Sequence, residues 1–188
     1  MMPRDLRCRN AGFGMIEVLV TLIILLVGLL GLAGLMLQSQ RAEMESYQRV
    51  QALVLLQDMA GRINGNRKVA TCYATTGLDP AYLGTGGAAA PDCAAGTTDQ
   101  NLRAKQDMTD WGNLLAGAAE SGSSGAMVGG RGCISYAAGV ATVSVAWQGL
   151  AATAPPPAAL TCGQGLYGNE SMRRVVSMPV QFANLSAP

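Results

Sequence analysis

The stretch "GFGMIEVLVTLIILLVGLLGLAGLMLQ", from Gly12 to Gln38, decides the architecture of this 188-residue chain. Residues 13–37 form a run of 25 whose only charge is Glu17, and a membrane-spanning helix needs roughly 20 apolar residues. An acidic side chain inside a bilayer costs about 2.5 to 3.5 kcal/mol on insertion scales. A carboxylate kept in such a segment is therefore expected to have a function.

The residues before this segment are basic. The sequence "MMPRDLRCRNAG" holds three arginines against one aspartate, and a basic flank predicts a cytoplasmic N-terminus with the rest of the chain delivered outward. Residues 1–12 are therefore treated as a targeting leader. The whole chain has a formal net charge of +1, so it has no large basic field, and nucleic acid is not expected as a primary ligand.

Cysteine usage agrees with export. Cys8 lies in the leader, and the other four, Cys72, Cys93, Cys133 and Cys162, lie in the exported part. An even number in an oxidising compartment predicts two disulfides. Of the three possible pairings we favour the sequential one, Cys72 with Cys93 and Cys133 with Cys162, each bond stabilising the fold by about 3 kcal/mol on a chain-entropy model. A zinc site is the alternative, but the chain has no histidine and no CxxC pair.

Three interpretations compete for the first 37 residues. An ordinary secretory signal peptide would use "GLA" at residues 31–33 for cleavage, but the apolar run is long and carries an acid near its start. A plain signal anchor leaves Glu17 unexplained. The third rests on the order of a basic leader, Gly12, Phe13, "GMI", Glu17 and a long apolar run. This order resembles the class III signal of type IV prepilins.

The resemblance implies that a prepilin peptidase cuts after Gly12 and methylates the new amine of Phe13. Glu17 then follows about 6 Å further along the helix, at 1.5 Å per residue. Opposite unit charges about 4 Å apart attract by roughly 4 kcal/mol at an effective dielectric constant of 20, so the pair offsets much of the insertion cost. In pilins such a pair is thought to set the register between subunits. The second glycine at Gly14 departs from the family's pattern and makes the cut bond ambiguous.

The helix is expected to continue through residues 38–66 and to end at "INGN", residues 63–66. One face of it recurs at spacings of three and four, which predicts that it carries the head: Ala52, Leu55, Leu56, Met59 and Ile63. A smaller apolar stripe lies roughly opposite: Tyr47, Val50 and Val54. Two interpretations of this stripe stay open, a wide core face and contact with neighbouring helices in a filament. Ion pairs along the helix are expected for Glu45 with Arg41 or Arg49, and for Asp58 with Arg62.

Residues 67–188 are expected to form the head. Residues 69–98 are predicted as a loop region pinned by Cys72 and Cys93. Residues 98–119 are predicted as a helix that starts with a Thr97–Gln100 capping box and places Trp111 in the core. The segment "SGSSGAMVGGRG", residues 121–132, has the composition of a flexible linker.

Alternating apolar residues predict strands in "VATVSVAWQ", residues 140–148, and "RRVVSMPVQF", residues 173–182, with residues 133–136 pairing with the first of these. Pro179 cannot donate to a ladder, so its strand should lie at an edge or contain a bulge. The expected fold is α+β: a long N-terminal helix, membrane-spanning in its first half (13–37) and amphipathic in its second (38–66), packed on a small antiparallel sheet with disulfide-pinned loops.

The order of long helix, cysteine loop, tryptophan-containing helix, then "GRGCISY", "VSVAWQG" and "CGQGLYGNESMRRVVS" is similar to that of PilV-type minor pilins (type IV pilus modification proteins). This resemblance implies a subunit that initiates pilus assembly with other minor pilins and the major pilin, and it makes a large tip adhesin a candidate partner. It also implies residence in the inner membrane, with the head in the periplasm, before the protein reaches the pilus at the cell surface.

Two alternatives stay open at this point: a pseudopilin of type II secretion or DNA uptake, and, in a different class, a membrane-anchored periplasmic binding module. Without histidine the chain has no Ser-His-Asp or Cys-His site. We therefore expect no catalytic residue, no metal and no cofactor.

Overall fold

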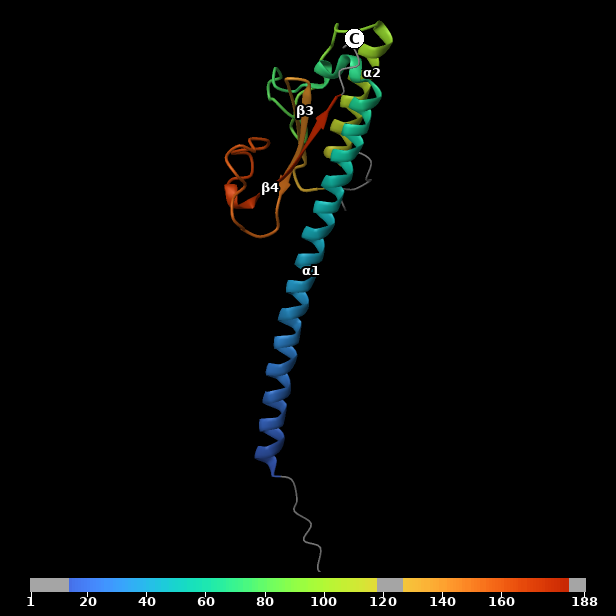
Figure 1. Ribbon diagram of the computed structural model, residues 1–188. Helices are drawn as coiled ribbons and strands as arrows, with labels where there is room; N and C mark the ends of the chain where they lie inside the picture. Colours follow the sequence, from blue (N-terminus) through green and yellow to red (C-terminus); the bar gives the residue numbers. More distant parts are fainter. Residues whose placement is uncertain (1–13, 118–126, 183–188) are drawn as a thin grey trace, which may run out of the picture. The chain divides into compact units, whose positions relative to one another are not determined.

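A computed structural model describes residues 14–117 and 127–182 of the chain (Figure 1). The leader, Gly12, Phe13 and the first half of the expected linker, residues 121–126, lie outside these residues. The second half is not the predicted flexible linker, because Met127 is buried in the core and Arg131 and Gly132 belong to a strand. The chain divides into two compact units, Met1–Glu43 and Met44–Pro188. Helix α1, Met15–Gly65, runs through both of them.

In the first unit, the described part of α1 is exposed along its whole length, and it is apolar as far as Leu37 except for Glu17 and Thr21. Within the described residues, α1 is the one helix long and apolar enough to cross a membrane, judged by length and composition. A helix suits this environment because it satisfies its backbone hydrogen bonds internally. The membrane-length apolar segment expected from the sequence is therefore helical.

In the second unit, a four-stranded antiparallel sheet has the order β1-β2-β3-β4. The strands are β1 Leu83–Gly84, β2 Arg131–Ala137, β3 Val140–Gln148 and β4 Arg173–Gln181. The helices are the second part of α1, the 3-10 helix η1 Arg67–Tyr73, α2 Thr98–Leu115 and the 3-10 helix η2 Glu170–Met172. The predicted α+β pilin-like fold is confirmed. Residues 69–98 are less irregular than predicted, because they contain most of η1 and all of β1.

The second part of α1, η1 and α2 contribute to one core with the sheet (Figure 1). All five residues of the predicted α1 face are buried, as are the β3 residues Val143, Val145 and Trp147. Trp111 is fully buried, and its indole N–H donates to the Leu55 carbonyl oxygen at 2.8 Å. Gly132 on β2 makes room for this ring, since a Cβ there would collide with it. The core position predicted for Trp111 is confirmed.

Helix α2 starts and ends where local chemistry dictates. The capping box is present: Thr97 accepts from the Gln100 N–H, and the Gln100 side chain accepts from the Thr97 N–H. The helix ends at Leu115, so the predicted end at residue 119 is wrong. Gly117 has φ +76°, a left-handed conformation that commonly terminates helices.

Two features of the sheet, the turn between β2 and β3 and the edge position of β4, agree with the residues found there. Strands β2 and β3 are joined by Ala138 and Gly139, both with positive φ, as a two-residue type I′ turn requires. The Phe182 N–H donates to the Gly139 oxygen, and amides alternate along an antiparallel strand. Position 179 therefore directs its nitrogen away from β3. Pro179 lies on the edge strand β4 and costs no ladder bond, which confirms the predicted edge position.

Candidate assembly site

Glu17 lies in the first turn of α1 and is exposed. Its backbone N–H donates to the Gly14 carbonyl oxygen at 2.9 Å. Its carboxylate forms no ion pair and no side-chain hydrogen bond within the part of the chain that the structure describes. A negative charge is favourable near a helix N-terminus because of the helix dipole. The first turn thus presents an exposed acid that has no ionic partner among the described residues.

The apolar stripe on α1 in the second unit is also exposed. Tyr47, Val50 and Val54 have 56%, 56% and 57% of their surface accessible. A wide core face therefore does not account for them. Sequence reasoning missed Met44 and Leu53, which are exposed on the same stretch of helix; Met44 precedes Tyr47 by three residues, a spacing that signals the same face.

The charged residues of α1 make one of the expected pairs along the helix, and others with residues outside it. Asp58 and Arg62 pair at 2.8 Å, as predicted. Glu45 does not pair along the helix; it binds Arg174 of β4 at 2.9 Å. Arg174 also donates to the carbonyl oxygens of Ala151 and Ser171. The pair predicted within the helix is replaced because a cation from the sheet, already held by two carbonyls, reaches the same carboxylate.

A buried polar network joins α1, η1 and α2. Asp107 accepts a hydrogen bond from the Tyr73 hydroxyl at 2.7 Å and one from Arg62 at 3.1 Å. Asn66, directly after α1, donates to the same hydroxyl at 3.2 Å. Burial, followed by the hydrogen bond to Asp107, raises the pKa of Tyr73, so the hydroxyl stays protonated. The network was not visible in the sequence because Asp107 lies 34 and 45 residues from its partners.

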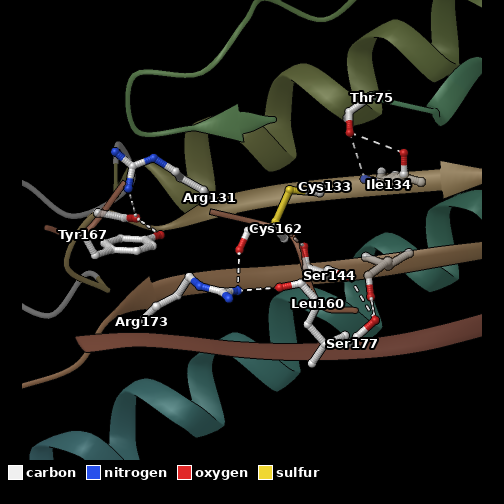
Figure 2. The surroundings of a disulfide bond; sticks show 12 residues. Thr75, Arg131, Cys133, Ile134, Ser144, Leu160, Cys162, Tyr167, Arg173 and Ser177 are labelled. Atoms are coloured by element: carbon white, nitrogen blue, oxygen red, sulfur yellow. Dashed lines mark hydrogen bonds between the residues drawn. A yellow bond between two sulfur atoms is a disulfide. The ribbon is translucent and has the colours of Figure 1, made fainter. Parts of the chain in front are cut away.

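Two disulfides fasten the loops of the head. Cys72 bonds to Cys93 and Cys133 to Cys162, with Cα–Cα distances of 5.6 and 5.8 Å. These are the sequential pairs favoured from the sequence. The first holds the loop before α2 against η1. The second holds the long loop between β3 and β4 against β2 (Figure 2).

The long loop is also held by Arg173, the first residue of β4, which is 1% exposed. Its guanidinium pairs with Glu170 at 2.6 Å and donates to the carbonyl oxygens of Leu160 and Cys162 (Figure 2). Glu170 accepts a further bond from the Gly165 N–H at 2.8 Å. That bond, and then the one from Arg173, lowers the pKa of Glu170. The buried charge of Arg173 is therefore compensated by Glu170.

A third tie joins the long loop to the start of the sheet. The Arg131 guanidinium lies 4.8 Å from the Tyr167 ring centre and 5.3 Å from that of Tyr82, within the range of cation–π attraction. The Tyr167 hydroxyl donates to the Gly129 carbonyl oxygen at 2.9 Å. The long loop is thus fixed at several points and forms an ordered part of the head.

The comparison with known families identifies the N-terminal segment. Residues 7–33 match the family described as "Prokaryotic N-terminal methylation motif". The match supports a prepilin signal of the type IV pilin kind at the N-terminus. The match includes Gly12, Phe13 and Glu17 together with most of the apolar part of α1. No curated protein and no solved structure matches the chain.

Proposed function

We propose that the chain is a minor pilin of the PilV type, a non-enzymatic subunit that takes part in initiating type IV pilus assembly. The observation that carries the proposal is the methylation motif at residues 7–33. It is supported by an exposed, membrane-length first part of α1 and by the α+β head that follows. In this proposal residues 1–12 are the leader, 13–37 the membrane and assembly helix, 38–66 its amphipathic continuation and 67–188 the periplasmic head.

Processing precedes assembly in this proposal. Prepilin peptidase cuts between Gly12 and Phe13, and the amine of Phe13 is methylated. The protein is held in the inner membrane by α1 until it enters the filament. The Glu17 carboxylate, which has no partner among the described residues, then pairs with the terminal amine of a neighbouring subunit. This pairing compensates a charge that is costly in an apolar environment and sets the subunit's register.

The exposed stripe of Tyr47, Val50 and Val54 is the second assembly surface. More than half of the surface of these apolar side chains is exposed. Covering it with another helix is favourable because it removes apolar surface from water. The partners proposed for this surface are the major pilin and other minor pilins. A large tip adhesin is a candidate partner of the assembled complex.

N-terminal sequencing and intact-mass measurement of the protein from its native host test the processing step. We expect a chain that starts at methylated Phe13. A chain that starts near residue 34, or one that keeps Met1, contradicts the proposal and leaves an ordinary signal peptide or anchor. The proposed role of Glu17 then falls with it.

The assembly step is tested by shearing filaments from cells and measuring how much of the protein they contain. We expect Glu17→Ala and Glu17→Leu to abolish incorporation while the processed protein stays in the membrane. Glu43→Ala is the matched control, because Glu43 is an exposed acid on the same helix without an ion pair among the described residues. If the protein is a membrane-anchored binding module, even its unmodified form will be absent from sheared filaments. If it is recovered only in secretion or DNA-uptake filaments, it is a pseudopilin.

A further inference from the structure

The face of the sheet that points away from the core carries a set of hydroxyl side chains. Ser135 on β2 is paired in register with Thr142 on β3, and Ser144 on β3 with Ser177 on β4. Side chains alternate between the two faces of a strand, and the intervening residues of β3, Val143 and Val145, belong to the core. The hydroxyls therefore share the outer face.

This outer face is the floor of a groove of about 500 Å³. Two loops supply the rest of the lining, one from Thr75 to Tyr82 and one from Ala159 to Leu166. The Cys133–Cys162 disulfide joins the second loop directly to the floor (Figure 2). Arg173 also binds the carbonyl oxygens of Leu160 and Cys162. The groove is thus held open by covalent and buried ionic ties, and its volume is in the range of small-molecule sites, roughly 300 to 1,000 Å³.

The lining is polar but carries no formal charge. Its side chains are hydroxyl, amide, aromatic and aliphatic: among the polar ones are Thr75, Thr76, Ser135, Thr142, Ser144, Thr161, Gln164 and Ser177. Three of these are already engaged, since Thr75 bonds to the Ile134 backbone and Ser144 to Ser177. The side chains of Ser135, Thr142 and Gln164 have no hydrogen-bond partner within the described residues. They are available to a ligand.

We propose that this groove binds a neutral carbohydrate of one or two sugar rings. Hydroxyl groups both donate and accept hydrogen bonds, and so do the hydroxyls of a sugar, whereas a charged ligand would be desolvated there without a counter-charge. Tyr82, one of the lining residues, supplies an aromatic ring for the apolar face of a sugar ring, while Arg131 lies over the same ring at 5.3 Å. The amide of Gln164 supplies a further donor and acceptor.

An extended peptide fits the groove less well. Peptides that bind sheets gain affinity by adding a strand to an edge, through main-chain hydrogen bonds. The groove presents the side-chain face of β2, β3 and β4, not an edge. A peptide main chain lying there would have to exchange its bonds to water for a few hydroxyl contacts.

Saturation-transfer NMR on the full-length chain tests the proposal, in a zwitterionic detergent that contains no sugar. The probes are lactose, cellobiose and N,N′-diacetylchitobiose, with sialyllactose as the charged comparator and a serine-rich neutral peptide as the competing class. We expect transfer to at least one neutral disaccharide with a dissociation constant tighter than about 10 mM. The charged comparator and the peptide should give no transfer.

The matched variants are Thr142→Val, which keeps the shape of the side chain, and Ser135→Ala. We expect each to weaken binding about tenfold, the loss of one to two net hydrogen bonds. Thr153→Val is the control, because Thr153 is exposed and lies outside the groove. Equal melting temperatures of all variants show that the head is folded.

Three outcomes overturn the proposal: no transfer to any of the neutral disaccharides, binding that Thr142→Val and Ser135→Ala leave unchanged, or transfer to the peptide alone. The measurement needs no filament, so it stands or falls independently of the proposed role in pilus assembly.

Discussion

The two units of the chain differ in how far their apolar and charged side chains find partners within the described residues. In the first unit α1 exposes its apolar side chains, and Glu17 has no ionic partner among the described residues. In the second unit Trp111 is fully buried with its N–H bonded, Asp107 has two donors, and Arg173 is fully compensated. The first unit therefore leaves its apolar side chains uncovered within the described residues, whereas the second unit has a core of its own. A substitution in the core of the second unit should therefore affect folding, and one in the first unit or in the exposed stripe should affect assembly.

The largest effect on folding is expected for Trp111→Ala. The change removes a large buried ring and its bond to the Leu55 carbonyl, and such truncations cost about 3 to 5 kcal/mol. Thermal or denaturant unfolding, followed by circular dichroism, measures the loss. Leu102→Ala on the same helix is the control, because Leu102 is 61% exposed and should change stability by less than about 0.5 kcal/mol. Equal effects at the two positions would mean that α2 does not pack as described.

A somewhat smaller effect is expected when the Cys133–Cys162 bond is removed by changing both residues to serine. The bond closes a loop with a sequence separation of 29 residues, and a loop of this size corresponds to roughly 3 kcal/mol. Because Cys162 lies in a satellite cluster with Tyr167, apart from the main core, we expect the long loop to become sensitive to protease before the rest of the head. Simultaneous cleavage throughout the head would contradict this division.

Within the second unit, some features follow from local sequence patterns and others do not. The α1 face, the capping box of α2, the β2–β3 turn and the edge position of Pro179 follow from local periodicity and turn chemistry. The Glu45–Arg174 pair joins residues 129 positions apart, so no local pattern announces it. Strand β1 has two residues, too few to show any alternation.

The groove shows a further limit of sequence reasoning. Serines and threonines in strands read as ordinary solvent-facing residues. Only the register, Ser135 opposite Thr142 and Ser144 opposite Ser177, brings them to one place. The loop that walls the groove has no periodicity, and its position is set by one disulfide and one buried arginine.

Acid should loosen the long loop before the main core. The folded-state pKa of Glu170 is lowered from 4.5 by the Gly165 N–H and by Arg173. Its contribution to stability is therefore complete above pH 4.5 and is lost as the pH falls through the folded-state pKa. We expect the melting temperature of the unmodified protein to fall more steeply below pH 4.5 than that of Glu170→Gln. Parallel pH profiles for the two proteins would show that this carboxylate does not hold the loop.

The smallest effect on folding is expected for the stripe. Changing Tyr47, Val50 and Val54 to serine removes side chains that contact little in the isolated chain, so the head should keep its melting temperature, each change costing within about 0.5 kcal/mol. If the stripe is an assembly surface, the triple variant should be depleted from sheared filaments while its amount in the membrane is unchanged. Arg49→Ser is the control, since Arg49 is exposed on the same helix, off the stripe. If the triple variant loses as much stability as Trp111→Ala, the stripe belongs to the core. If the triple variant enters filaments as well as the unmodified protein does, the stripe is not a contact surface. The pairing of an unchanged head with a depleted filament is the result that assigns these side chains to other subunits, because no intramolecular role produces it.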